Sequence, residues 1–313
     1  MSNTTILDTN VTVQQVINWN PFKAVLSMTP CFFFLYVNLV MLVTLRSKVV
    51  FQETSRYILL TNMLFVDSIN LLVSFLLYIF AVVRVQLNGI ICLVIVVSSD
   101  ITTPISPFNL ALMSLEQYIA ICFPLRHAEI ATSRRTGVSI GVIWMLGSLT
   151  SLTDVIVFVI TGSTFDIKWG YCTRPLVFHL KVHEVLNKTF SGIYFTSVGV
   201  IIIYTYIGIV VAARSAASDK MSANKARKTV LLHLIQLGLY LASLSHESII
   251  IAVYQYLDLI TAVNIQYVAF LGLIIFPRCL SPLVYGLRDQ TFRPIFKYYF
   301  TFGLRSTVKP VLI

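Results

Sequence analysis

Charged residues are scarce in this sequence of 313 residues: they make up 12%, whereas soluble domains carry about a quarter. Hydrophobic residues make up 57%, and the mean hydropathy is +0.83. This composition excludes an ordinary soluble domain, and the long apolar runs rich in Phe and Tyr exclude a disordered chain. No unit of about 20 to 50 residues recurs, which argues against a repeat array and an obvious inverted-repeat transporter. What remains is an integral membrane protein.

Motifs of catalytic centres are also missing. His246 and Glu247 begin a zinc-hydrolase motif, but Ile250 stands where the second histidine is required. No other set of His, Cys or carboxylate residues has the spacing of a catalytic metal site, and no Gly-x-Ser-x-Gly elbow occurs. We therefore expect no enzyme activity, cofactor or metal. The net charge of +10 does not indicate a nucleic-acid partner, because in a membrane protein the location of charges matters more than their sum.

Seven apolar runs are long enough to cross a bilayer, for which a helix needs about 20 residues. They predict an all-α membrane protein: a seven-transmembrane helix bundle over residues 24–286, between an extracellular segment 1–23 and a cytoplasmic segment 287–313. The predicted spans are 24–45, 57–83, 92–122, 137–161, 190–213, 229–256 and 262–286.

The distribution of basic residues predicts the orientation of the bundle. Most of the 23 Lys and Arg residues fall in the odd-to-even connections and the C-terminal segment, so the N-terminus is expected outside. The glycosylation sequons at Asn3, Asn10 and Asn187 then all face outside. Residues 1–23 lack the features of a cleaved signal peptide, so the first span is expected to target the chain.

Of the five cysteines, only Cys92 and Cys172 lie on the oxidising side in this orientation. They are predicted to form a disulfide that holds the long outer loop across the mouth of the bundle. Two free thiols are the alternative.

Residues 113–127, which contain Glu116-Gln117-Tyr118 and end in Pro-Leu-Arg-His, resemble the signature of vertebrate odorant receptors, which are rhodopsin-like G-protein-coupled receptors. Residues 281–288 are similar to the Asn-Pro-x-x-Tyr box of these receptors. The residues of both motifs look most like those of the fish and amphibian members of the family. The resemblance implies a plasma-membrane receptor of sensory neurons. It would bind an extracellular small-molecule odorant and activate a cytoplasmic G protein, of the olfactory stimulatory type.

The resemblance also implies a switch at the inner end of the bundle, and this sequence departs from it at one position. The family has an arginine where Gln117 stands, and Gln lacks the permanent charge and the bidentate fork of Arg. Higher basal signalling, weaker coupling and little effect all remain open. The other residues assigned to the switch and to G-protein coupling are Glu116, Tyr118, Tyr206, Lys225, His233, Pro282 and Tyr285.

Two opposite charges lie at one depth inside the membrane. Asp67 and Arg278 are each about 14 to 15 Å from the inner ends of their spans, at 1.5 Å per residue. Because a charge in the bilayer needs a partner, we expect the two to form an ion pair. Bonds from Arg278 to backbone carbonyls or water are the alternative.

Further polar residues gather toward the outer side, where the resemblance implies the odorant pocket. Asp100 and Thr103 share a helical face, and Asp154 and Glu247 lie at a similar level. Carboxylates that face one cavity repel, so we expect a cationic or zwitterionic ligand, an amine or amino acid; rim residues bonded to solvent are the alternative. The remaining residues assigned to the pocket are Ser243, His246, Tyr267 and Phe270, of which the aromatic ones could simply pack.

Residues 289–300 alternate aromatic and basic side chains, which predicts a short amphipathic helix lying on membrane lipid.

Two rival functions stay open. A secondary transporter would use Asp67, Asp100 and Arg278 as a path, and a non-signalling binder of the same fold would be explained by Gln117.

Overall fold

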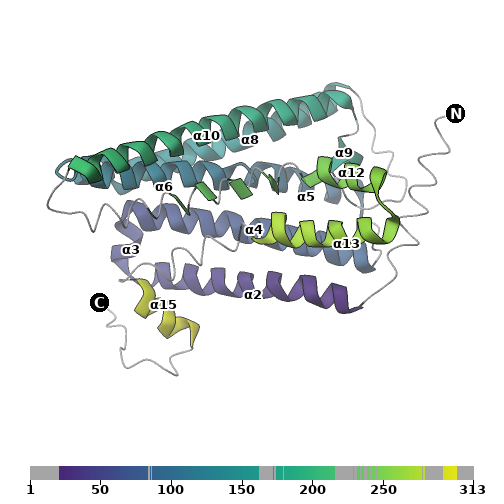
Figure 1. Cartoon of the computed structure of the whole chain (residues 1–313), viewed down its shortest axis with the longest axis horizontal. Coiled ribbons are helices and arrows are strands. Elements are labelled where there is room, and N and C mark those ends of the chain that lie inside the picture. The colour runs from purple at the N-terminus through teal and green to yellow at the C-terminus, as the bar shows by residue number, and fades with distance from the viewer. Residues whose placement is uncertain are drawn as a thin grey trace.

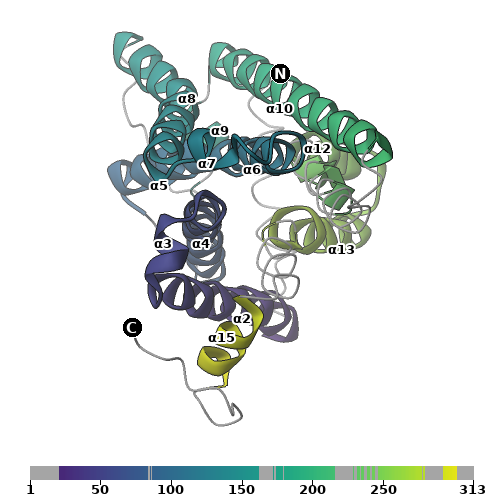
Figure 2. The ribbon, with the colours of Figure 1, turned by 90° about the vertical axis from the view of Figure 1, so that its left-hand side faces the viewer.

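The computed structural model describes residues 21–83, 85, 87–161, 172, 174–178, 180–215, 228, 231–232, 234–235, 238–239, 242–243, 246–276, 278 and 292–301, and all regular structure within them is helical. Long helices run side by side along the molecule (Figure 1) and form a bundle when viewed from one end (Figure 2). The long helices are α2 (Pro21–Arg46), α4 (Ser55–Val83), α5 (Gly89–Thr102) with α6 (Ile105–Cys122), α8 (Ser133–Ile160) and α10 (Lys181–Ser215). The shorter ones are α3 (Val49–Glu53), α7 (His127–Ile130), α9 (Arg174–Val177), α12 (His246–Tyr256), α13 (Leu259–Ala269), η1 (Phe270–Ile275) and α15 (Phe292–Phe300).

The first five predicted spans are confirmed, because five helical segments are long and apolar enough to cross a membrane. Of the sixth predicted span, α12 forms the outer end. Of the seventh, α13 and η1 form the outer part, and residues 279–286 lie outside the described residues.

The fifth span begins earlier than predicted, at Lys181 instead of residue 190. The first turns of α10 are charged, so their hydropathy does not mark them as part of a span. They are nevertheless helical, and Lys188 donates to Glu184 one turn earlier across 2.5 Å. Such i, i+4 pairs favour a helix in water.

The third span is broken into α5 and α6 at Thr103 and Pro104. Pro107 follows one turn later and has no N–H to give to the carbonyl of Thr103. The break therefore leaves polar backbone at the outer third of the bundle.

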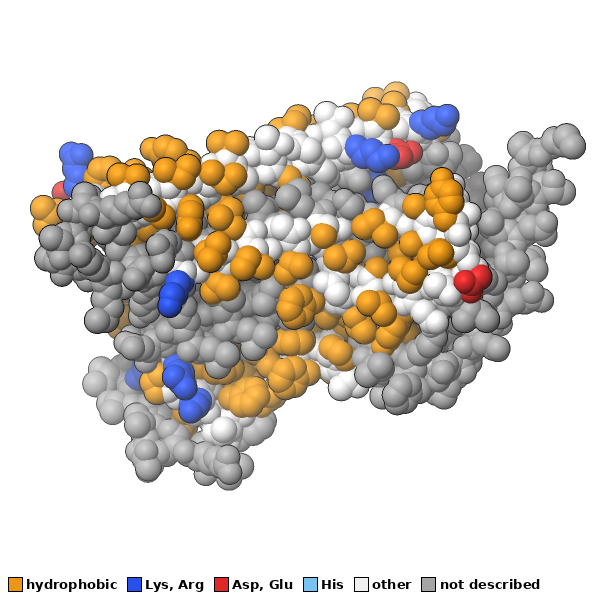
Figure 3. All heavy atoms as spheres, viewed as in Figure 1, with side chains coloured by type: hydrophobic (Ala, Val, Ile, Leu, Met, Phe, Trp, Pro, Cys, Tyr) orange, Lys and Arg blue, Asp and Glu red, His pale blue; other side chains and the backbone are white. Residues whose placement is uncertain are grey.

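A core of apolar side chains joins α2, α4, α6, α8 and α10. Trp144 of α8 adds a polar link, because its indole N–H donates to the Asn62 side chain of α4 across 3.0 Å. On the face shown in Figure 3, hydrophobic side chains cover the middle and charged ones lie toward the two ends. Exposed apolar side chains at mid-helix positions give the bundle a surface suited to lipid; examples are Leu39, Leu72, Leu152, Val200 and Ile203.

The predicted amphipathic helix is confirmed as α15, which packs beside α2 (Figure 2). Phe292 is fully buried against the Phe51 ring, with 5.8 Å between ring centroids. The Tyr36 hydroxyl donates to the Phe300 carbonyl across 3.3 Å. In Figure 1, α15 and α3 lie at one end of the bundle and α9 lies at the other, so the inner and outer predicted features are well separated.

Candidate functional site

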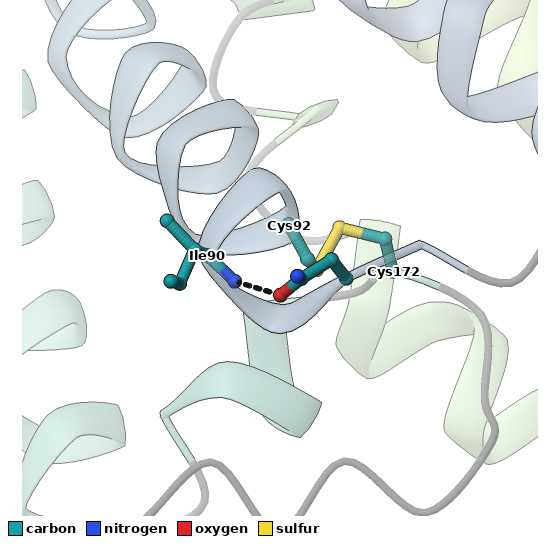
Figure 4. Close-up of a disulfide and its surroundings, with 4 residues drawn as sticks. Ile90, Cys92 and Cys172 are labelled. Carbon is teal, nitrogen blue, oxygen red and sulfur yellow. Dashed lines mark hydrogen bonds between the residues drawn. A yellow bond between two sulfur atoms is a disulfide. The ribbon is translucent and has the colours of Figure 1, made fainter.

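The outer end of the bundle is organised by the predicted disulfide, which is confirmed. Cys92 in the first turns of α5 is bonded to Cys172, with 5.5 Å between their Cα atoms (Figure 4). The adjacent cap is also visible in that view, where the Asn88 side chain accepts from the backbone N–H of Ile90 at 3.1 Å. The bond holds Cys172 against α5. Arg174 follows Cys172 by two residues, so it is held close to the same helix.

Arg174 lies between two carboxylates from different helices. Its Nε donates to Asp100 of α5 at 2.8 Å, and its Nη2 donates to Asp154 of α8 at 2.6 Å. Burial alone lowers the pKa of the Arg174 guanidinium, but the charges and hydrogen bonds of the two carboxylates raise its pKa above the ordinary value. The sequence interpretation treated Asp100 and Asp154 as repelling carboxylates and did not include Arg174. In the structure, one guanidinium joins them.

His183 extends this cluster to α10. Its Nδ1 lies 2.8 Å from the second oxygen of Asp154, and both side chains are almost completely buried. The imidazole packs on the Phe178 ring at 4.9 Å, and the Arg174 guanidinium lies 5.6 Å from the centre of the same ring. We call Asp100, Asp154, Arg174 and His183 the outer polar cluster, which links α5, α8, α9 and α10.

A cavity of ≈ 230 Å³ adjoins the outer polar cluster. The predicted pocket residues Asp100, Thr103 and Ser243 line it. Asn187 of α10, which the sequence predicts only as a glycosylation sequon, also lines the cavity. Glycosylation of Asn187 stays a prediction. The remaining lining residues are Pro104, Thr150, Arg174, Ser191, Tyr194, Phe195 and Ile274.

Other predicted pocket residues lie elsewhere. Asp154 is fully buried beneath Arg174 instead of lining the cavity. Tyr267 and Phe270 are not among the lining residues, and the Phe270 ring stacks on Tyr78 with 6.0 Å between centroids. His246 begins α12, but its side chain and that of Glu247 lie outside the described residues.

Sequence reasoning missed Arg174, His183 and Tyr194 as site residues. Arg174 carried one usable signal, since it stands two residues after the predicted disulfide cysteine and must lie over the bundle. Tyr194 lies about two helical turns after Asn187, and its hydroxyl donates to the Leu146 carbonyl at 2.9 Å. Nothing in the sequence marks that contact, because it joins residues 48 positions apart.

The two intramembrane charges have hydrogen bonds of their own. Asp67 is fully buried and accepts from the Ser106 hydroxyl at 2.8 Å. Arg278 donates from Nη1 to the Ile274 carbonyl at 2.9 Å, which is the backbone alternative. The ion pair between Asp67 and Arg278 stays a prediction.

The Ile274 carbonyl belongs to η1, a π-helical turn. The N–H of Phe276 bonds to the Leu271 carbonyl, five residues earlier. Ser243, on the sixth span, donates to the Leu273 carbonyl of the same turn. Because Ser243 and Ile274 line the cavity, the cavity adjoins this joint between the sixth and seventh spans.

At the inner end, the residues assigned to the switch meet neighbouring helices. Glu116 lies 3.1 Å from the His127 ring nitrogen, and the side-chain oxygen Oε1 of Gln117 accepts from Arg56 at 3.4 Å. Tyr118 packs so closely on Gly208 of α10 that a Cβ there would lie 2.4 Å from the ring. Tyr206 is half-buried and packs on the main core. Six predicted residues lie outside the described residues: Asn3, Asn10, Lys225, His233, Pro282 and Tyr285.

Residues 37–285 match the family described as 7 transmembrane receptor (rhodopsin family). The chain is also 36% identical over 272 residues to Odorant receptor 131-2 of Danio rerio, a match that covers 86% of this chain and 83% of that protein. The chain belongs to the odorant receptors of the rhodopsin family. The receptor is further similar to Olfactory receptor 1073 of Rattus norvegicus, at 25% identity over 79% of this chain and 80% of that protein. It is 24% identical to Olfactory receptor 4K2 of Homo sapiens, over 57% of this chain and 56% of that protein.

Membership in this family confirms the predicted fold and the general function. The receptor is a multi-pass plasma-membrane protein that takes a small-molecule ligand and couples to a G protein. Its family is one of receptors and not of enzymes. The matches lend no support to a transporter or to a non-signalling binder.

Proposed function

We propose that this receptor detects a small cationic or zwitterionic molecule, an amine or an amino acid, in the outer cavity and activates an olfactory stimulatory G protein. The observation that carries the ligand class is the Asp100 carboxylate at the cavity wall, within a cluster where one arginine joins two carboxylates. The choice of G protein follows from the similarity to odorant receptors.

The charges around the cavity favour a cation. With His183 as a neutral imidazole, Asp100 and Asp154 carry two negative charges against the one positive charge of Arg174. A ligand ammonium beside Asp100 compensates this excess in a site of low dielectric, where opposite charges attract more strongly than in water. A neutral ester gains nothing comparable.

The remaining lining suits a small, hydrogen-bonding ligand. Hydroxyl groups of Thr103, Thr150, Ser191 and Ser243 face the cavity and can accept from an ammonium group. The volume of ≈ 230 Å³ lies below the range of roughly 300–1,000 Å³ that is usual for drug-sized ligands. Tyr194 and Phe195 supply an apolar wall for a short side chain.

The test is cyclic AMP production in cells that express the receptor with the olfactory stimulatory G protein. Amines, amino acids and neutral esters are compared, and Asp100→Asn is compared with Glu184→Gln at equal surface expression. Glu184 is an outer carboxylate on α10 whose side chain is 64% exposed and is not part of the cavity, so it controls for the loss of one negative charge.

We expect amines or amino acids to give the strongest signals. Asp100→Asn should weaken their potency by about 10- to 100-fold, because a hydrogen bond to a charged group contributes roughly 1.5–3 kcal/mol. Glu184→Gln should leave potency unchanged. A response confined to esters, or equal potency in Asp100→Asn, contradicts the ligand class.

A further inference from the structure

The inner end of α6 has a guanidinium beside it that comes from another helix. Arg56 in the first turn of α4 donates from Nη2 to the side-chain oxygen Oε1 of Gln117 at 3.4 Å. Both side chains are half-buried. The position at which the related receptors are expected to have arginine is thus neutral here, and a cation lies in contact with it.

The start of α4 is fixed in place by contacts to α8. The Ser55 hydroxyl lies 2.7 Å from the Thr136 hydroxyl in a buried pair, and Ser133 donates to the Glu53 carbonyl. Tyr57 packs on Phe51 with 4.7 Å between ring centroids. These contacts flank Arg56 on both sides, so its backbone is positioned next to Gln117 by the fold.

Gln117 and Arg56 are chemically matched. The Gln117 amide presents an oxygen to the guanidinium, whereas an arginine in its place would bring two cations together. Glu116 already has His127 as a partner at 3.1 Å, on the short helix α7. The distance of 3.4 Å to Gln117 exceeds the usual 2.7–2.9 Å of a charge-assisted hydrogen bond, so this bond is weak and exchanges at little cost.

We propose that Arg56 supplies the positively charged contact between the inner end of the bundle and the G protein, in the role that Gln117 cannot fill. In the resting receptor the guanidinium is kept beside α6 by the Gln117 oxygen. On coupling it transfers to a carbonyl or carboxylate group of the G protein, for which the planar fork of Arg is well suited. The inference rests on G-protein coupling and is independent of the ligand class.

The experiment measures GDP–GTP exchange on purified stimulatory G protein by purified full-length receptor, without added ligand. Native receptor is compared with Arg56→Gln, Arg56→Lys, Gln117→Arg and the exchange variant Arg56→Gln/Gln117→Arg. Arg135→Gln is the matched control, because Arg135 is an exposed arginine at the same end of the bundle, in the first turn of α8. The thermal unfolding temperature of each variant is measured alongside.

We expect Arg56→Gln to lower the exchange rate by about tenfold or more, as the loss of a charged hydrogen bond predicts. Arg56→Lys should keep part of the rate, and Arg135→Gln should keep all of it. Gln117→Arg alone should give no gain, and the exchange variant should recover most of the native rate because it returns one guanidinium to the same place.

Three results overturn the inference. A native rate in a folded Arg56→Gln variant shows that this cation is not needed. A loss in Arg56→Gln that the exchange variant does not recover assigns Arg56 a structural role only. If the native receptor gives no exchange with the stimulatory or any other G-protein type, either without ligand or with the amines and amino acids, coupling itself is absent, and the proposed function fails together with this inference.

Discussion

Gly147 of α8 lies where the outer half of the bundle is packed most closely on the broken third span. A Cβ at this position would lie 3.0 Å from the Ile101 carbonyl oxygen and 3.0 Å from Cγ1 of Ile105. Ordinary contacts are about 3.3–3.6 Å to a carbonyl oxygen and about 3.5–4.0 Å between carbons. Gly147→Ala therefore requires α8 to move away from α5 and α6 by a few tenths of an ångström.

The energetic effect of Gly147→Ala follows from two opposing contributions. Overpacking a core typically costs about 1–3 kcal/mol, and replacing Gly by Ala in a helix gains about 0.8–1.0 kcal/mol. Gly141, on the same helix, has nothing within 4 Å of a Cβ, so Gly141→Ala keeps the gain in helix propensity and has no overpacking cost. The two variants should therefore differ by about 1–3 kcal/mol in the free energy of unfolding.

The assay is thermal unfolding of the two purified variants in the same detergent. One kcal/mol corresponds to a shift of roughly 2–4 °C for a chain of 150–250 residues, so Gly147→Ala should unfold several degrees below Gly141→Ala. Because Ile101 directly follows Asp100 at the cavity wall, Gly147→Ala should also weaken ligand potency. Equal unfolding temperatures in the two variants would refute the close packing of α8 on the broken span.

Two further predictions concern the outer and inner ends. Cys172→Ser should lower the free energy of unfolding by about 4 kcal/mol, the chain-entropy value for a separation of 80 residues, and the unfolding temperature measures this loss. The same variant should weaken ligand potency in a dose-response assay, because Arg174 is no longer held by the disulfide two residues before it. Phe292→Ala should cost about 3–5 kcal/mol, because the ring is fully buried against Phe51; an unchanged unfolding temperature would contradict this packing of α15.

Much of the fold could be predicted because hydropathy and the membrane impose strong constraints. The apolar runs marked the first five spans within a few residues at most boundaries, and the division into an oxidising and a reducing side selected Cys92 and Cys172. The start of α10 could not be found in this way. Its first turns are charged, and hydropathy places the start of a span only after such charged residues.

The candidate site was only partly predictable, because sequence patterns give the depth and face of a residue but not the path of a loop. Asp100 and Thr103 both line the cavity, as their shared helical face allows, and their role in ligand binding stays a prediction. Arg174 was missed because the outer loop contains no periodic pattern that indicates which helix it touches. Asn187 was predicted only as a glycosylation site, because a sequon gives no information on whether the asparagine side chain lines a cavity.

The π-helical turn at Phe270–Ile275 has a consequence for how residues along the seventh span can be compared. A bond from Phe276 to Leu271 places one additional residue in that turn, so Arg278, the described residue that follows, is rotated by about 100° relative to a regular α-helix. Arg278 is therefore out of phase by one position with the outer half of the span. Removing one residue from this turn would leave the length of the sequence almost unchanged, yet it would redirect Arg278 to a different neighbour. In this receptor the angular position of Arg278 depends on a single turn beside the outer cavity.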